Sequence, residues 1–122
     1  MNKDTSRDKE FSGDNIYEMQ CPVIYALDIV GQKWRLPIMW CLLELEPIRY
    51  NELKRKIKGI TNMMLTKSLK ELEEQNLIVR TQYETIPPKV EYSLTERGRA
   101  LLPALNELKK WGEEQLKIKD SK

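Results

Sequence analysis

Hydrophobic positions recur with helical spacing in five segments of the chain and alternate with polar positions in two others. The helical segments are residues 22–30, 33–45, 52–57, 62–75 and about 96–116. The alternating segments, residues 77–83 and 89–94, predict two strands. Pro87 and Pro88 lie between these strands and cannot donate ladder hydrogen bonds, so residues 84–88 are expected to project as a loop.

Residues that favour helix ends stand at the borders of the helical segments. Pro22 suits the first position of the first helix because its missing N–H would have no helical partner there, and Cys21 is then the N-cap. Asn51, Thr61 and Thr95 are expected to cap the third, fourth and last helices through their side-chain oxygens.

The order of these elements predicts a mainly α fold with a small β-hairpin wing, a winged helix-turn-helix. A short extended piece, residues 47–50, precedes the third helix, and residues 58–60 form a tight turn before the fourth. Residues 1–15 and 117–122 are polar, and we expect them to be a flexible arm and tail on either side of one domain, residues 16–116.

The fourth helix separates its residues into two faces. Leu65, Leu69 and Leu72 fall in one narrow stripe at roughly 100° per residue, which predicts a core face. The opposite face is polar and basic; its residues are Asn62, Met63, Thr66, Lys67 and Lys70.

Charge changes the interpretation of that second face. The net charge is only +2, but residues 53–70 carry six basic side chains and no acidic one, which suits a polyanionic partner. In a helix-turn-helix protein the first turn of the second helix enters the major groove. Lys67 and Lys70 would then contact phosphates or guanine, Asn62 adenine, and Met63 and Thr66 a thymine methyl.

Further basic residues flank this helix and suit phosphate contacts, which supply affinity without sequence information. They are Lys54, Arg55 and Lys56 in the third helix, and Arg80 and Lys89 in the wing.

Other functions stay open at this point. A lysine-rich helix face is often merely solvated, and a winged helix can also bind protein or RNA. An enzyme is disfavoured because the chain has no histidine, no glycine-rich phosphate loop and no recognisable nucleophile motif. Neither a metal site nor a cofactor is expected, because Cys21 and Cys41 are too far apart for a metal-binding pair.

The compartment follows from the same composition. The polar start of the chain has no signal-like apolar region, and the longest apolar stretch contains Glu44 and Glu46, so no membrane association is expected. We predict a cytoplasmic protein, in which the two cysteines are reduced. Cys41, Trp34 and Trp40 are interpreted as core residues.

Three passages resemble the HxlR-type winged helix-turn-helix transcriptional regulators, whose fold is MarR-like. These passages are "CPVIYALDIVGQKW", "LKRKIKGITNMMLTKSLKELEEQNLIVR" and "IPPKVEYSLTERGRALLPALNELKKWG". The resemblance covers about residues 20–112, and the "CP" opening, the "KW" pair, the wing passage and the closing "WG" occur in register. Gln32 departs from the two glycines that the family often has before "KW".

The resemblance implies a homodimer that binds double-stranded DNA at a palindromic operator. The first and last helices would form much of the dimer interface, through Val23, Ile24, Leu27, Leu101, Leu105, Leu108 and Trp111. An apolar stripe in the last helix supports this independently.

A sensing role is the second implication of the resemblance. Members of the family often carry a cysteine at the position of Cys21, and in some it senses oxidants or electrophiles. The helix dipole favours a thiolate at a helix N-terminus, although a cysteine there can also be an unreactive cap residue. Similar regulators can bind small molecules in an apolar cleft near the dimer interface, and nothing in the sequence identifies such an effector.

Overall fold

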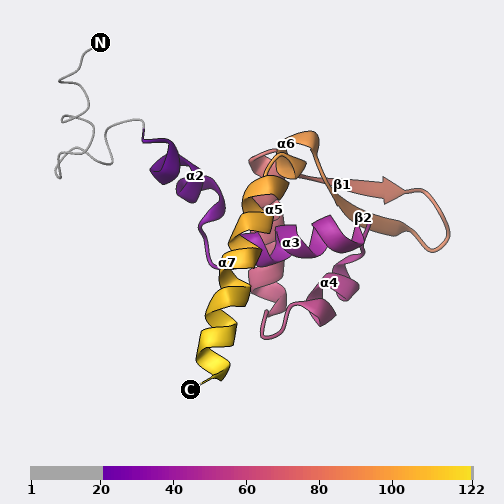
Figure 1. Ribbon diagram of the computed structural model, residues 1–122. Helices are drawn as coiled ribbons and strands as arrows, with labels where there is room; N and C mark the ends of the chain where they lie inside the picture. Colours follow the sequence, from indigo (N-terminus) through magenta and orange to yellow (C-terminus); the bar gives the residue numbers. More distant parts are fainter. Residues whose placement is uncertain (1–20, 122) are drawn as a thin grey trace, which may run out of the picture. The chain divides into compact units, whose positions relative to one another are not determined.

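A computed structural model describes residues 21–121 of the chain (Figure 1). The chain divides into two units, one ending at Lys33 and one beginning at Trp34. The single domain expected over residues 16–116 stays a prediction. The first unit contains helix α2, Pro22–Val30, with Pro22 in its first turn and Cys21 at the N-cap as expected. The predicted arm, residues 1–15, lies outside the described residues.

The second unit contains the helix-turn-helix and the wing. Its elements are α3 (Arg35–Leu45), α4 (Tyr50–Lys56), α5 (Asn62–Glu74), β1 (Ile78–Tyr83), β2 (Lys89–Leu94), α6 (Glu96–Arg99) and α7 (Leu102–Asp120). The antiparallel hairpin pairs Ile78 with Leu94 at its base and Tyr83 with Lys89 near its tip. It projects beyond the helices with its loop at the free end (Figure 1). The predicted mainly helical fold with a hairpin wing is confirmed.

The core of the second unit forms around α3 and the leucine stripe of α5. Ile38, Met39 and Leu42 of α3 are fully buried, as expected for a helix that is covered on most sides. The predicted stripe of α5 (Leu65, Leu69, Leu72) is also buried, and the wing adds Ile78 and Leu94 at its base. The core therefore fixes which face of α5 points outward.

The start of α4 differs from the sequence prediction. Asn51 was expected to be the N-cap, but the helix begins at Tyr50 and Arg49 occupies the cap position without a side-chain hydrogen bond. The reason lies just before the helix, where the backbone of Ile48 exchanges hydrogen bonds of 3.1 and 2.8 Å with Tyr92 of β2. The extended piece ends at that bridge, so the chain turns into the helix earlier than predicted.

The predicted last helix is divided into two, α6 and α7. Thr95 caps α6 as expected, because its Oγ1 accepts a 3.1 Å hydrogen bond from the Gly98 amide. Pro103 has no N–H to donate to the carbonyl of Arg99, so the helix cannot continue unbroken. At its other end α7 continues to Asp120, so residues 117–120, predicted as tail, are helical. Within residues 21–121, none of the helices combines the length and apolar character that crossing a bilayer requires.

Candidate nucleic-acid interface

A left-handed glycine turn joins α4 to α5. Gly59 has a φ of 88°, a conformation that glycine adopts without steric cost. Thr61 then caps α5 as predicted, its Oγ1 accepting a 3.1 Å hydrogen bond from the Met64 amide. The turn and the cap together set the position at which α5 begins.

The outward face of α5 carries all the residues of this helix that the sequence predicted as DNA contacts. Asn62, Met63, Thr66, Lys67 and Lys70 are all exposed. Met63 is 81% exposed, an unusual position for a large apolar side chain on a helix that already has a buried face. The structure therefore brings these side chains together on one open surface.

A partly buried ion pair connects this helix to the core helix α3. Arg35 donates a 2.9 Å hydrogen bond from Nη2 to Oε1 of Glu71, and the arginine is almost fully buried. This hydrogen bond and the arginine charge lower the pKa of the Glu71 carboxyl below its ordinary value, although partial burial opposes them. Lys67 approaches the same carboxylate only to 4.0 Å, so its ammonium group remains open to another anion.

The three basic residues of α4 do not share one surface. Arg55 is exposed and lines an open groove, of volume about 590 Å³, between α4 and the wing residues Pro88 and Val90. Lys56 lines a different groove, beside Trp34 and Trp40, and Lys54 is half-buried. Among the three, Arg55 is best placed for contact with a partner that also touches the wing.

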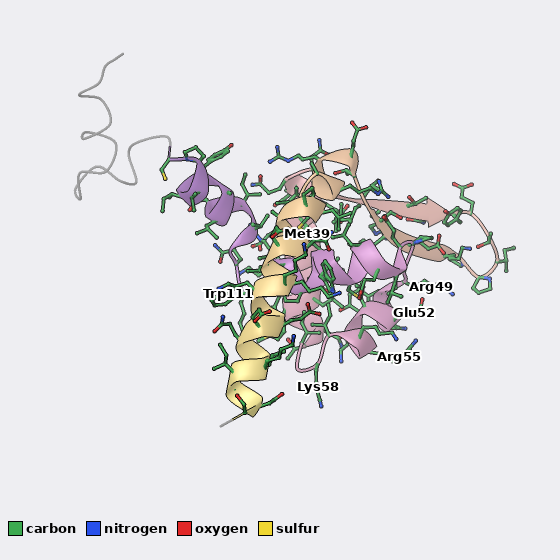
Figure 2. The ribbon with its side chains drawn as sticks, in the orientation of Figure 1. Met39, Arg49, Glu52, Arg55, Lys58 and Trp111 are labelled. Atoms are coloured by element: carbon green, nitrogen blue, oxygen red, sulfur yellow. The ribbon has the colours of Figure 1, made fainter. Side chains whose placement is uncertain are left out.

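Sequence reasoning missed Arg49 as a candidate contact. It is exposed and lines the groove that Arg55 lines, and Figure 2 shows both along the outer side of α4 with Glu52 between them. The only signal in the sequence was a basic residue in the short extended piece before α4. Two guanidinium groups beside one carboxylate leave the groove with a net positive charge.

The wing residues Arg80 and Lys89 lie on opposite strands. Arg80 is exposed, and its guanidinium donates a 3.4 Å hydrogen bond to Oε1 of Gln82. The Lys89 ammonium lies 3.8 Å from Glu91 Oε2 and 4.7 Å from the centre of the Tyr83 ring. Arg80 is therefore more available to an anion than Lys89.

The two cysteines have different environments. Cys21 is partly exposed at the N-cap of α2. Cys41 is buried in α3, and its burial, together with the nearby carboxylate of Glu44, raises the pKa of its thiol. A raised pKa disfavours the reactive thiolate, consistent with the prediction of an inert core residue. Among residues 21–121, no three His, Cys, Asp or Glu side chains gather as a metal site would require.

The residues predicted for a dimer interface differ in how far their side chains are exposed to solvent. Val23 and Leu27 of α2 and Leu108 and Trp111 of α7 are more than half exposed, whereas Ile24 and Leu101 are intermediate. Leu105 is an exception, because it is only 7% exposed within a single chain and thus belongs to the monomer's own core.

Trp34 and Trp40, predicted as core residues, are only half-buried. They line an open groove of about 580 Å³ together with Pro37, Leu45 and Ile57. Lys109 of α7 lies 5.8 Å from the centre of the Trp40 ring. These indoles therefore lie at the edge of the core rather than inside it.

Comparisons with known proteins agree with this geometry. Residues 29–120 match a family model described as HxlR-like helix-turn-helix. An uncharacterised HTH-type transcriptional regulator of Halalkalibacterium halodurans is 46% identical over 103 residues, which cover 84% of this chain and 91% of the relative. The oxidised redox regulator HypR superposes with a TM-score of 0.72 at 44% identity, covering 77% of this chain and 96% of HypR. Diamide-treated YodB of B. subtilis superposes with a TM-score of 0.65 at 34% identity, covering 79% of this chain and 95% of YodB.

Proposed function

Because the chain belongs to the HxlR-like family of helix-turn-helix transcriptional regulators, we propose that it binds an inverted-repeat operator as a homodimer. This family consists of transcriptional regulators rather than enzymes, and the partner of such a regulator is DNA. The observation that carries the proposal is the exposed face of α5, where two lysines, an asparagine, a threonine and a methionine lie together opposite a buried leucine stripe.

In the proposed complex, α5 enters the major groove. Lys67 and Lys70 contact phosphates or the O6 and N7 atoms of guanine, and Met63 and Thr66 contact the methyl group of thymine. Arg49 and Arg55 bind the phosphate backbone where it passes between α4 and the wing, with Arg80 as a further wing contact.

Homodimer formation would explain the exposed apolar surface of two helices. Val23 and Leu27 in α2 and Leu108 and Trp111 in α7 are large apolar side chains that one chain leaves open to water. A two-fold interface through these helices presents two copies of α5 to the two halves of a palindrome.

Selection of bound fragments from the source genome tests this proposal. We expect an enriched inverted repeat whose half-sites are about one helical turn apart. A rival function, binding of protein or RNA by the same fold, is favoured if no duplex sequence is enriched. An asymmetric or single half-site would contradict the dimeric part of the proposal.

Cys21 supports a second, regulatory proposal, namely that oxidation of this thiol weakens operator binding. It is partly exposed at a helix N-terminus, and one structural relative, HypR, is a redox regulator. Hydrogen peroxide would convert the thiol into a sulfenic acid with release of water, a two-electron oxidation.

Peroxide titration of operator binding tests the role of Cys21. We expect oxidant to weaken binding by the unmodified chain and by Cys41→Ala, the matched control at the buried cysteine, but not by Cys21→Ser. If peroxide weakens operator binding by Cys21→Ser as much as it weakens binding by the unmodified chain, the proposal is wrong.

A further inference from the structure

One tyrosine hydroxyl connects α4 to the first turn of α5. The Tyr50 hydroxyl lies 3.1 Å from the backbone oxygen of Asn62, 3.2 Å from Asn62 Oδ1 and 3.0 Å from Thr66 Oγ1. Asn62 and Thr66 are both exposed residues of the face proposed to read bases. Tyr50 itself is only half-exposed, so α4 holds its hydroxyl beside that face rather than in front of it.

The number of protons in this cluster determines how its members are oriented. A phenol has one proton to donate, and both Asn62 oxygens can only accept it. When Tyr50 donates to Asn62, the Thr66 hydroxyl must donate to Tyr50, because the phenol proton is already used. The Asn62 side chain then has its oxygen turned to Tyr50, and its NH₂ group is the part without a partner in this cluster.

We propose that Tyr50 is a positioning residue for base recognition, because its hydroxyl orients the Asn62 amide and the Thr66 hydroxyl. With both groups held in this way, α5 presents the Asn62 NH₂ as a hydrogen-bond donor and the Thr66 methyl group as an apolar contact. The base read by Asn62 then carries an acceptor, such as N7 or O6 of guanine, N7 of adenine or O4 of thymine. Cytosine, which offers the N4 donor in the major groove, is disfavoured at that position.

This inference rests on the proposed binding of DNA by α5, and it refines the assignment of Asn62. The sequence suggested that Asn62 reads adenine, which in its bidentate form uses the amide oxygen and the NH₂ together. The contact with Tyr50 holds the amide oxygen on the side of the hydroxyl, and we therefore assign the base contact to a single hydrogen bond donated by the NH₂ group. The Tyr50 hydroxyl thereby limits which bases the helix accepts, although it need not touch DNA.

The test is a comparison of binding preferences among variants of the full chain. The probes are the palindromic duplex obtained by selection, its single-base variants changed symmetrically in both half-sites, and a scrambled duplex. Asn62→Ala and Thr66→Ala first identify the base positions that these residues read. At those positions, Tyr50→Phe should lower the preference for the selected base about fivefold, the loss expected for one hydrogen bond. Its affinity for scrambled duplex and its thermal midpoint should stay unchanged.

Two further variants sharpen the comparison. Tyr83→Phe removes a phenol hydroxyl from the wing, and it should leave the base preferences as they are. Asn62→Asp exchanges the NH₂ donor for an acceptor, and it should shift the preference at its position towards cytosine, whose N4 donates. Retention of the original base by Asn62→Asp would show that the NH₂ group is not the reading atom, and the proposal would be wrong.

The outcomes separate this inference from the function on which it rests. If Asn62→Ala and Thr66→Ala lose base preference but Tyr50→Phe keeps it, the positioning role fails and the proposed function stands. A uniform loss of affinity for all duplexes in Tyr50→Phe, with a lower thermal midpoint, would mean that the hydroxyl is merely structural. If no substitution on α5 changes binding to any duplex, the proposed function itself fails.

Discussion

Lys67 and Lys70 illustrate how little the folded chain depends on the side chains that we assign to DNA. Both are exposed on α5, opposite the buried Leu65 and Leu69. The only ion pair of Lys67 among the described residues is a 4.0 Å approach to Glu71, and ion pairs at such exposed positions contribute little to stability. The two lysines can therefore be removed without cost to the fold.

We predict that Lys67→Ala and Lys70→Ala each weaken operator binding and reduce the slope of log affinity against log salt by about 1, the effect of one lost phosphate contact. Their free energies of unfolding should stay within about 0.5 kcal/mol of the parent. Anisotropy titrations at several salt concentrations and urea unfolding measure the two quantities. Lys119→Ala, an exposed lysine in the last turn of α7, is the control and should change neither. Loss of the fold in either α5 variant would mean that the face was misassigned.

Single residues also show where the sequence was informative and where it was not. The exposed face of α5 was predictable, because three leucines at helical spacing determine the phase of the helix. The role of Tyr50 was not predictable, because its partners lie 12 and 16 positions along the chain and meet it only after the turn at Gly59. Leu105 lies in the apolar stripe of the last helix, but the sequence pattern could not show that it is buried within a single chain.

At the scale of elements, the predicted order was correct and the errors lie at helix boundaries. The Asn51 side chain is well suited to capping a helix, yet the bridge between Ile48 and Tyr92 places the start of α4 two residues earlier than predicted. Pro103 was expected near the beginning of one long helix, and it lies in the first turn of α7, with α6 as a separate short helix before it. Local preferences predicted which elements exist, whereas a pairing with a remote segment decided where α4 begins.

The contact between α3 and α5 leads to a prediction about pH. Arg35 lowers the pKa of Glu71, so the folded state favours the carboxylate more than the unfolded state does. This stabilisation is fully present above the ordinary value of 4.5, and it is lost as the pH falls through the lower folded-state pKa. Glu71→Gln should therefore be less stable than the parent near neutral pH, and the gap should shrink in acid.

Urea unfolding from about pH 7 to about pH 3 measures this gap directly. Glu73→Gln, two positions along the same helix, is the control, and we expect its stability relative to the parent to change much less with pH. If the free energies of unfolding of Glu71→Gln and the parent differ by the same amount at every pH in this range, the carboxylate charge does not contribute to stability.

At the scale of the whole molecule, the described residues form two units, and each leaves apolar surface open. The sequence could show an apolar stripe in the last helix, and the family resemblance suggested that the first and last helices dimerise. Exposure within one chain reduces the set of residues that can form the predicted dimer interface. Val23, Leu27, Leu108 and Trp111 are exposed and can contact a second copy, whereas Leu105 is buried. A second copy of the chain is the partner that a palindromic operator would require.

We predict that Trp111→Glu abolishes the proposed dimer and leaves a monomer, because a charge in an apolar interface is left without a partner. Sedimentation velocity should show the smaller species, and operator affinity should fall because one recognition helix is lost from the complex. Asn106→Glu adds the same charge on the other side of α7, where it should leave the dimer intact. A dimer that persists in Trp111→Glu would place the interface elsewhere.

The central claim is that this chain recognises DNA in a sequence-specific way, through a basic face that contacts phosphates. Its most direct test is the affinity of the unmodified protein for the selected palindrome and for a scrambled duplex across a range of salt concentrations. We predict that log affinity falls steeply and linearly with log salt for both duplexes, and that the palindrome is preferred by about 10³-fold or more. Affinities that are insensitive to salt and equal for the two duplexes would contradict the account.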